Sequence, residues 1–362
     1  MLNSVLVMQS TFRVRIVMAA TGAGFRAAFR EAALIEWLQA LGHDAVAFRA
    51  YPHTSPKPDD TGLIRHFPTD GPVPYDQLST SQALIDAVLR DKPDVVVIRV
   101  ADYAMCHTAA AALPVSTPVI LIAGGEGQHP AINGRIDYLL CEYAGQSDVA
   151  LFPRLKGWAV FPKFVNWTAL KDAEAESKTY DIVNIGTFEP RKNQAALIPL
   201  GEKYRLCFVG EGEKRPEVEE MAKGFSAGAF TFTGECAGVD VYRHIARSRL
   251  MVHPSTYEGF PRVFAESLAS GVPVVAFKTT FPRLEPPPGV ILIEPDSLVP
   301  AVEHLLSTDC GVIGHAGKAY AESTFRDDNI FSLFLEAMET CCRRRDGWGF
   351  SLRRNFWKLF SS

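Results

Sequence analysis

The chain has 362 residues and a formal net charge of −4, and this length allows two domains that each bury a core of their own. Hydrophobic residues make up 47% of the chain and charged residues 22%, as is usual for a globular protein. The slightly acidic balance argues against a general nucleic-acid binder, which would normally carry an excess of basic residues.

The seven cysteines are odd in number and show no C-x-x-C pair of the metal-binding kind. We therefore expect free thiols in a reducing cytoplasm and no metal site. Residues 1–10 have no cationic region ahead of their short apolar run, so we expect no secretory signal. No uninterrupted apolar stretch approaches the ~20 residues needed to span a bilayer.

The first half of the chain alternates buried strands with helices. We expect strands at residues 14–20, 45–48, 63–67, 95–100 and 118–123, and helices at residues 25–38, 79–90 and 105–113. The segment around the third strand is rich in Pro, Asp, Thr and Gly and should form a long surface loop. Strands that alternate with helices in this way predict a doubly wound parallel sheet.

A charged run that contains alanines separates the two halves, and it indicates a linker at about residues 166–179. The second half then repeats the alternation of strands and helices. We expect strands at residues 181–186, 206–209, 230–233, 250–252 and 272–277. Helices are expected at residues 239–246, 263–268, 301–306, 311–323 and 328–343.

The most informative stretch of this half is HPSTYEGFPRVFAESLASGVP at residues 253–273. It predicts a strand, a glycine loop, a helix and a strand, with Pro261 in the first helical turn and Gly271 as the helix stop. The backbone amides and the dipole of a helix N-terminus favour an anion such as phosphate. Glu258 precedes this helix and Glu266 lies about two turns further on, so the two carboxylates should have different roles.

The stretch resembles the signature of retaining GT-B glycosyltransferases of the family 4 type, the glycosyl transferases group 1. The resemblance implies the GT-B fold, an α/β architecture of two Rossmann-like domains facing a central cleft. It places an acceptor-side domain at residues 1–165, a nucleotide-sugar donor domain at 180–330, and a helix that crosses back, followed by a tail, at 331–362. The plain alternative is a strand–turn–helix with two solvated glutamates.

In that family the first glutamate lies beside the donor sugar, the loop amides hold the diphosphate, and the second glutamate accepts hydrogen bonds from the ribose hydroxyls. The resemblance therefore implies that Glu258 is catalytic and that Glu266 binds the ribose. The other donor-binding candidates in this loop are Gly259, Phe260, Pro261 and Arg262.

The sequence DIVNIGTFEPRKN at residues 181–193 resembles the family's strand followed by Gly-Arg-x-x-x-x-Lys, in which both cations hold the diphosphate. Lys192 matches the lysine and is a candidate for catalysis and for donor binding. Thr187 stands at the arginine position, so Arg191 would have to substitute from the other side of the loop. Both cations could instead belong to a solvated helix start. Further candidates on the nucleotide side are Gly186, Gly210 and Glu235.

Many family members carry a histidine directly after the strand that corresponds to residues 118–123. Here Gly124 and Gly125 stand there, and the nearest histidine is His129, which we take as a catalytic candidate beside Glu126. His129 could equally be an ordinary loop residue. Arg26, after the first strand, is a candidate for acceptor or phosphate contact, against the alternative of a solvated arginine.

Basic and aromatic residues interleave over residues 343–362. Such a tail can anchor a protein on anionic lipid, at the inner face of the cell membrane, or can pack its aromatic residues on the first domain or on a partner subunit.

The resemblance implies retaining transfer of a sugar from a nucleoside diphosphate donor, a UDP- or GDP-sugar, to a hydroxyl of a glycan or lipid-linked acceptor. It implies no obligatory metal or other cofactor, because preorganised donors would stabilise the departing diphosphate. Assembly of surface polysaccharide or glycolipid is the family's usual setting. Two alternatives are a nucleotide-sugar epimerase or hydrolase on the same fold, and a non-catalytic sugar-nucleotide binder.

Overall fold

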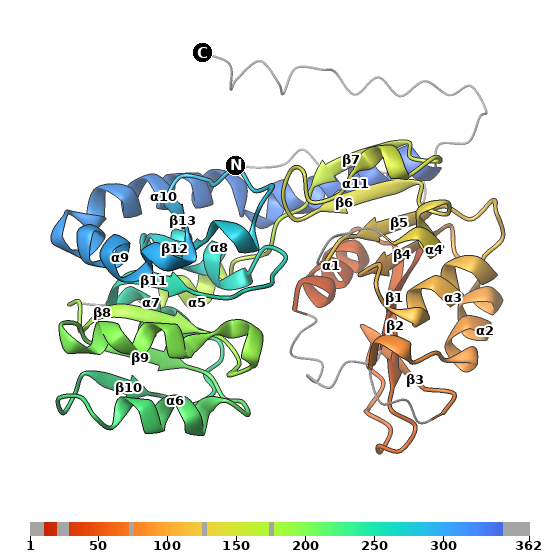
Figure 1. The fold of residues 1–362 in the computed structure, drawn as a ribbon. Helices are drawn as coiled ribbons and strands as arrows, with labels where there is room; N and C mark the ends of the chain where they lie inside the picture. The colour runs from red at the N-terminus through yellow and green to blue at the C-terminus, as the bar shows by residue number, and fades with distance from the viewer. Residues whose placement is uncertain (1–10, 20–28, 72–75, 125–128, 174–176, 343–362) are drawn as a thin grey trace, which may run out of the picture.

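The computed structural model describes residues 11–19, 29–71, 76–124, 129–173 and 177–342. Within them the chain forms two α/β halves, each built on one parallel sheet (Figure 1). Arg26, Gly125, Glu126 and the tail at 343–362 lie outside the described residues.

The first sheet has the strand order β3-β2-β1-β4-β5-β6-β7, and all neighbouring strands are parallel. Its strands are β1 (Arg13–Met18), β2 (Asp44–Tyr51), β3 (Ile64–Pro68), β4 (Val95–Arg99), β5 (Val119–Ile122), β6 (Tyr138–Cys141) and β7 (Gly157–Val160). Its helices are α1 (Phe29–Ala40), α2 (Gln82–Asp91), α3 (Ala104–Ala112) and α4 (Pro130–Asn133). The order reverses between β1 and β4, which is where ligands bind in doubly wound sheets.

The second sheet has the order β10-β9-β8-β11-β12-β13 and is also parallel throughout. Its strands are β8 (Tyr180–Ile185), β9 (Leu206–Val209), β10 (Phe230–Phe232), β11 (Ser248–His253), β12 (Val274–Phe277) and β13 (Val290–Ile293). Its helices are α5 (Trp167–Lys171), α6 (Arg215–Ala222), α7 (Val239–Ala246), α8 (Arg262–Ala269), α9 (Leu298–Ser307) and α10 (Cys310–Thr324). Here the order reverses between β8 and β11.

Short 3₁₀ turns complete the connections, at η2 (Asp76–Leu78), η3 (Val149–Leu151), η4 (Pro190–Lys192), η5 (Gln194–Glu202), η6 (Lys278–Thr280) and η7 (Pro295–Ser297). The alternation predicted from sequence is confirmed, with differences at a few ends, but helices α4, α5 and α6 were not expected. The helix expected from residue 79 begins at Gln82, because the Ser81 side chain caps it by accepting a hydrogen bond from the Leu84 amide. Strand β13 was missed, since its four residues follow a proline-rich loop with no helical or alternating pattern around them.

The last helix, α11 (Asp327–Cys342), lies on the first sheet beside β6 and β7 (Figure 1). Its buried face, which includes Ile330, Phe334 and Met338, belongs to the hydrophobic cluster on one side of that sheet. Lys156 donates a hydrogen bond to the carbonyl of Cys341 (3.3 Å), so the helix C-terminus is held by a cation as well as by packing. The chain therefore returns from the second half to complete the core of the first.

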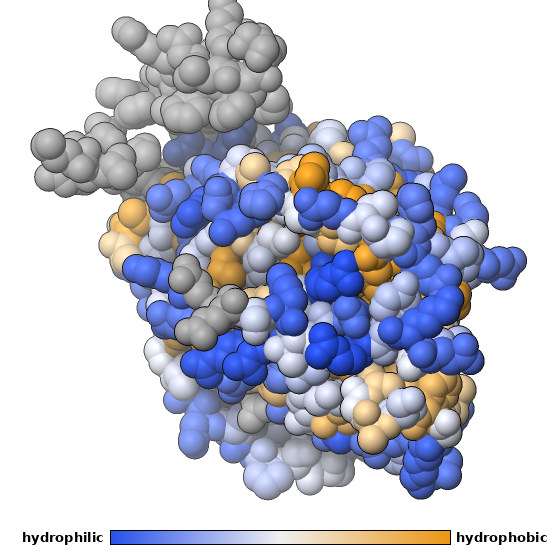
Figure 2. Space-filling view, turned by 90° about the vertical axis from the view of Figure 1, so that its left-hand side faces the viewer, coloured by the Kyte–Doolittle hydropathy of each residue, from blue (hydrophilic) through white to orange (hydrophobic). Residues whose placement is uncertain are grey.

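All seven cysteines are unpaired in the structure. Among the described residues no helix combines the length with the apolar composition that a bilayer span requires. Figure 2 shows the molecule from the side on which the second half lies. The surface seen there is mostly hydrophilic, with apolar residues gathered into smaller patches.

Replacing Phe334 with alanine should lower the free energy of unfolding by about 3–5 kcal/mol, because a fully buried ring would leave a cavity between α11 and the first sheet. Denaturant unfolding measures the change. Val312→Ala is the control, since Val312 is 69% exposed on α10 and should shift the value by less than about 0.5 kcal/mol. Equal effects of the two substitutions would contradict the packing of α11.

Candidate active site

The two sequence motifs of the second half meet at the carboxyl edge of its sheet. Strands β8 and β11 are neighbours, so the loops that follow them leave the sheet side by side. The amide of Thr256 donates to the carbonyl of Arg191 (2.8 Å), and the side-chain amide of Asn193 donates to the carbonyl of Pro254 (3.3 Å). These hydrogen bonds join segments more than sixty residues apart into one site at the topological switch point.

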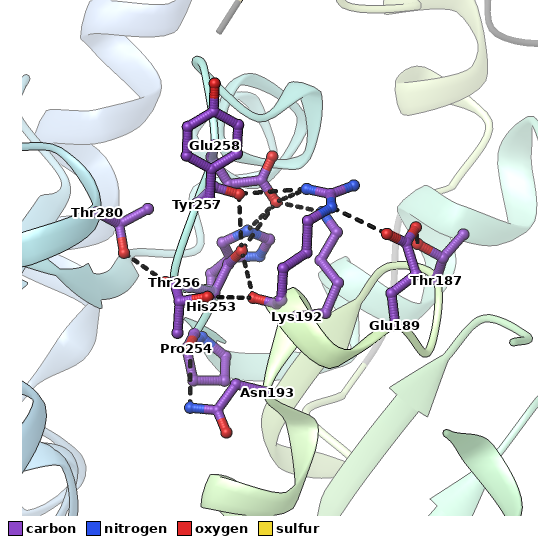
Figure 3. A network of polar contacts seen from close by, with 12 residues as sticks. Thr187, Glu189, Lys192, Asn193, His253, Pro254, Thr256, Tyr257, Glu258 and Thr280 are labelled. Atoms are coloured by element: carbon purple, nitrogen blue, oxygen red, sulfur yellow. Dashed lines mark hydrogen bonds and ion pairs between the residues drawn. The ribbon is translucent and has the colours of Figure 1, made fainter. Parts of the chain in front are cut away.

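Glu258 is the centre of a polar network in this site (Figure 3). Its Oε1 lies 3.0 Å from Nη1 of Arg191, 3.3 Å from Nε2 of His253 and 3.1 Å from Oγ of Ser255. The ammonium of Lys192 also pairs with Oε1. Among the described residues none hydrogen-bonds to Oε2, so one oxygen of the carboxylate is held while the other is open to a ligand.

The carboxylate of Glu258 is ionised in this setting. Burial alone would raise its pKa, but the hydrogen bond from His253 and the charge of Lys192 outweigh burial and lower the pKa to about 2. Burial lowers the pKa of His253, which favours the neutral imidazole. A neutral His253 that donates through Nε2 leaves Nδ1 unprotonated, and Nδ1 is buried without a hydrogen-bond partner.

Arg191 makes contacts with both loops of the site. Its Nε donates to Glu189 (2.9 Å), whose carboxylate also accepts the Thr187 hydroxyl. Its Nη1 donates to the carbonyl of Tyr257 (3.2 Å) as well as to Glu258. The guanidinium is therefore fixed between two carboxylates, one on each of the two loops.

Glycines line the adjoining strand ends, where the backbone must approach closely. Gly210 has a φ of +144°, and a Cβ there would lie 2.0 Å from the carbonyl oxygen of Gly186. The amide of Gly210 donates to the carbonyl of Gly234 (2.8 Å), which precedes Glu235. The stem of Lys192 runs over Gly186, where an added Cβ would meet its Cδ at 3.6 Å. The candidates Gly186, Gly210 and Glu235 thus belong to one edge of the sheet.

Helix α8 begins at Arg262, and Pro261 is its N-cap residue, so the expectation that Pro261 lies in the first helical turn is wrong by one position. The carboxylate of Glu266 is buried on this helix and lies 3.4 Å from Nε of Arg262. Burial raises the pKa of Glu266, and the charge of Arg262 opposes the rise only in part. A buried carboxylate is stable when cations or hydrogen-bond donors compensate its charge, and Arg262 is the cation near Glu266.

The amide of Phe260, a candidate for holding the diphosphate, donates instead to Oε2 of Glu142, at 2.8 Å. Glu142 follows β6 and therefore comes from the first half of the chain. Pro261 has no amide hydrogen to offer. An anion at this helix would have to use the amides of Gly259 and Arg262 or the side-chain cations.

His129 lies in the first half, where it caps α4 by accepting a hydrogen bond from the Ala131 amide (3.2 Å). Its ring stacks on His107, with 4.0 Å between the ring centroids. No contact among the described residues joins it to Glu258. At Gly124, one of the two positions where the resemblance implies a histidine, a Cβ would lie 2.9 Å from Cγ2 of Val100, so this backbone position is crowded for any larger residue.

Sequence reasoning missed four members of the site. His253 and Ser255 stood inside the quoted stretch but received no role, and Glu189 stood inside the second motif. These three residues could have been identified because they stand close in the sequence to Glu258 and Arg191. Glu142 had no comparable signal, because it reaches the site from the other sheet.

Among the described residues no cluster of three or more His, Cys, Asp or Glu side chains could hold a metal ion. The ion cluster around Glu258 consists of two cations and two carboxylates, Arg191 and Lys192 with Glu189 and Glu258. Such an arrangement suits a bound anion that displaces part of these pairings.

Residues 180–308 match the family model described as glycosyl transferases group 1. The resemblance to group 1 glycosyltransferases is confirmed. A GDP-mannose-dependent alpha-mannosyltransferase from Mycolicibacterium smegmatis is 29% identical over 131 residues, which make up 34% of this chain and 34% of that protein. The chain thus spans about a third of the length of the curated relatives that it matches.

Solved structures cover both halves. Sucrose-phosphate synthase from Thermosynechococcus elongatus superposes with a TM-score of 0.69 at 17% identity, over 90% of this chain and 98% of that one. HepE from Anabaena, solved with UDP and glucose, superposes with a TM-score of 0.65 at 14% identity, over 91% and 100%. The fold is GT-B, as predicted, with two Rossmann-like domains.

Replacing Glu258 with glutamine should make the free energy of unfolding depend less on pH under acidic conditions. A folded-state pKa of about 2 against an ordinary 4.5 contributes stability above pH 4.5 that is lost as the pH falls toward 2. The full contribution is on the order of 3 kcal/mol. Urea unfolding between pH 3 and 6 should show the variant losing less stability than the parent. Glu322→Gln, at an exposed carboxylate on α10, should keep the parental slope, and a parental slope for Glu258→Gln would contradict the ion cluster.

Proposed function

We propose that the protein is a retaining hexosyltransferase that moves a sugar from a nucleoside diphosphate to a hydroxyl acceptor. The observation that carries the proposal is the convergence of Arg191 and Lys192 on one oxygen of Glu258, at the glycine-lined edge of the second sheet. The match of this domain to group 1 glycosyltransferases supports it.

The two cations would stabilise the diphosphate as it departs. A diphosphate carries more negative charge than either carboxylate, so it can draw Arg191 from Glu189 and Lys192 from Glu258. Because Glu189 and Glu258 hold the cations in place beforehand, little reorganisation is needed when charge develops on the leaving group. Arg191 would thus serve where relatives carry an arginine at the position of Thr187.

The carboxylates would hold the donor's hydroxyl groups. Oε2 of Glu258 is available to a sugar hydroxyl while Oε1 remains bound to the protein. Glu266 is buried on α8 with only partial charge compensation, and two vicinal ribose hydroxyls would supply the missing donors. No role for His129 follows from its contacts, and its catalytic part stays a hypothesis for the donor-bound state.

The donor is proposed to be a UDP- or GDP-sugar. A mannosyltransferase that is similar to this domain depends on GDP-mannose, and HepE was solved with UDP and glucose. The acceptor would be a glycan or a lipid-linked glycan, in the assembly of surface polysaccharide or glycolipid. The protein would act in the cytoplasm or at the inner face of the membrane.

Adding the correct donor without metal should raise the melting temperature by several degrees, because a ligand at 100 times its Kd stabilises the folded state by about 2.7 kcal/mol. A panel of UDP-, GDP-, ADP- and CMP-sugars identifies it by thermal shift. Lys192→Ala and Glu266→Ala should lose most of the shift.

The controls are Lys203→Ala and Glu322→Ala, at exposed positions away from the site, and they should keep the whole shift. A parental shift in both site variants would remove these residues from the donor site. Free sugar or an epimer formed without acceptor would favour the hydrolase or epimerase. Binding without turnover across an acceptor panel would favour the non-catalytic binder.

Residues 343–362 would anchor the protein on anionic lipid, a proposal that rests on their sequence alone, since they lie outside the described residues. Each basic residue near such a surface contributes on the order of 1 kcal/mol. Deleting this tail should abolish co-sedimentation with vesicles that contain phosphatidylserine, while vesicles of phosphatidylcholine should bind neither form. Unchanged sedimentation of the shortened chain would overturn the proposal.

A further inference from the structure

The segment that follows β6 in the first domain is docked on the second domain. The ring of Tyr143 packs against the hydrophobic cluster around α8 in the second domain. Gly145 has a φ of +82°, and a Cβ at that position would lie 3.4 Å from the carbonyl oxygen of Arg283. Residues 142–147 therefore form a contact between the domains, and we call them the docking segment.

Glu142 is the first residue of the docking segment, and its side chain is only 3% exposed. Oε2 accepts the hydrogen bond from the Phe260 amide at 2.8 Å, and Oε1 pairs with the ammonium of Lys163. The backbone amide of Glu142 donates to Oε1 of Gln146 (2.6 Å), which closes the segment on itself. The carboxylate is thus held at both of its oxygens and cannot turn away from Phe260 without losing these bonds.

Phe260 stands two residues after Glu258 and directly before the N-cap of α8. Its ring is buried against Phe264 and Phe325, with centroids at 5.6 and 6.4 Å, so the packing orients the peptide that carries its amide. An anion near a helix N-terminus is favoured by the helix dipole. A carboxylate from the first domain consequently fixes the loop that bears Glu258.

We propose that Glu142 is a positioning residue that holds the Glu258 loop to the first domain through the Phe260 amide. The arrangement of the two domains and the placement of Glu258 are then coupled by one hydrogen bond. It follows that the donor diphosphate is bound by Arg191 and Lys192 and not by the Phe260 amide. The part of the inference that concerns the donor rests on the proposed function.

The first test measures hydrogen–deuterium exchange at the Phe260 amide by mass spectrometry, which needs no donor. Glu142→Ala removes the acceptor and should speed exchange about ten- to hundredfold, as expected for loss of a hydrogen bond to a charged group. Glu142→Gln retains an acceptor oxygen and should stay within about tenfold of the parent. Exchange that is unchanged in Glu142→Ala would overturn the proposal.

The matched control is Asp309→Ala, which also removes a carboxylate that accepts a backbone amide at a helix start, here Gly311 at 2.8 Å. It should leave exchange at Phe260 unchanged. If it speeds that exchange as much as Glu142→Ala does, the effect comes from general loss of stability and the positioning role is wrong.

The second test compares steady-state constants for the donor. Glu142→Ala should raise the donor KM roughly tenfold with a smaller change in kcat, and Glu142→Gln should restore most of the loss. Faster exchange with an unchanged KM would overturn the positioning role although the contact is real. If the parent protein binds and transfers no nucleotide sugar, the proposed function fails, and the exchange experiment still decides whether Glu142 holds the loop.

Discussion

The pairing of β8 with β11 is the constraint on which the site depends. These strands lie on either side of the point where the strand order of the second sheet reverses, so the loops that follow them leave in the same direction. Hydrogen bonds to the backbone carbonyls of Arg191 and Pro254 then join the loops and bring Arg191 and Lys192 to Glu258. Side chains alone would not hold two cations on one carboxylate oxygen, because long side chains lose conformational entropy when they are ordered.

The charges of this cluster balance one another within the protein. Two cations close together would repel each other, and Glu189 and Glu258 compensate both of them. The same carboxylates keep the cations oriented, so a diphosphate would meet preformed donors and would not have to order flexible chains. The low pKa of Glu258 and the neutral imidazole of His253 are consequences of this arrangement and of burial.

The two domains are joined by more than the connecting chain. Helix α11 completes the first core after the chain has built the second, and the docking segment reaches from the first domain to α8. Arg326 stacks over Trp167 with 4.0 Å between its Cζ and the ring centroid, where the chain passes between the domains in both directions. Contacts of this kind couple the donor loop to the domain arrangement.

The sequence by itself determined the alternation of strands and helices, the parallel sheets and the identity of the Glu258, Glu266 and Lys192 motif residues. Apolar periodicity and motif spacing are local properties, so they can be recognised along the chain. Only the tertiary structure decided that Arg191 lies between Glu189 and Glu258, that Glu142 accepts the hydrogen bond of the Phe260 amide, and that His129 stacks on His107. These outcomes depend on which strand ends lie side by side, and that is set by long-range packing which no short stretch of sequence encodes.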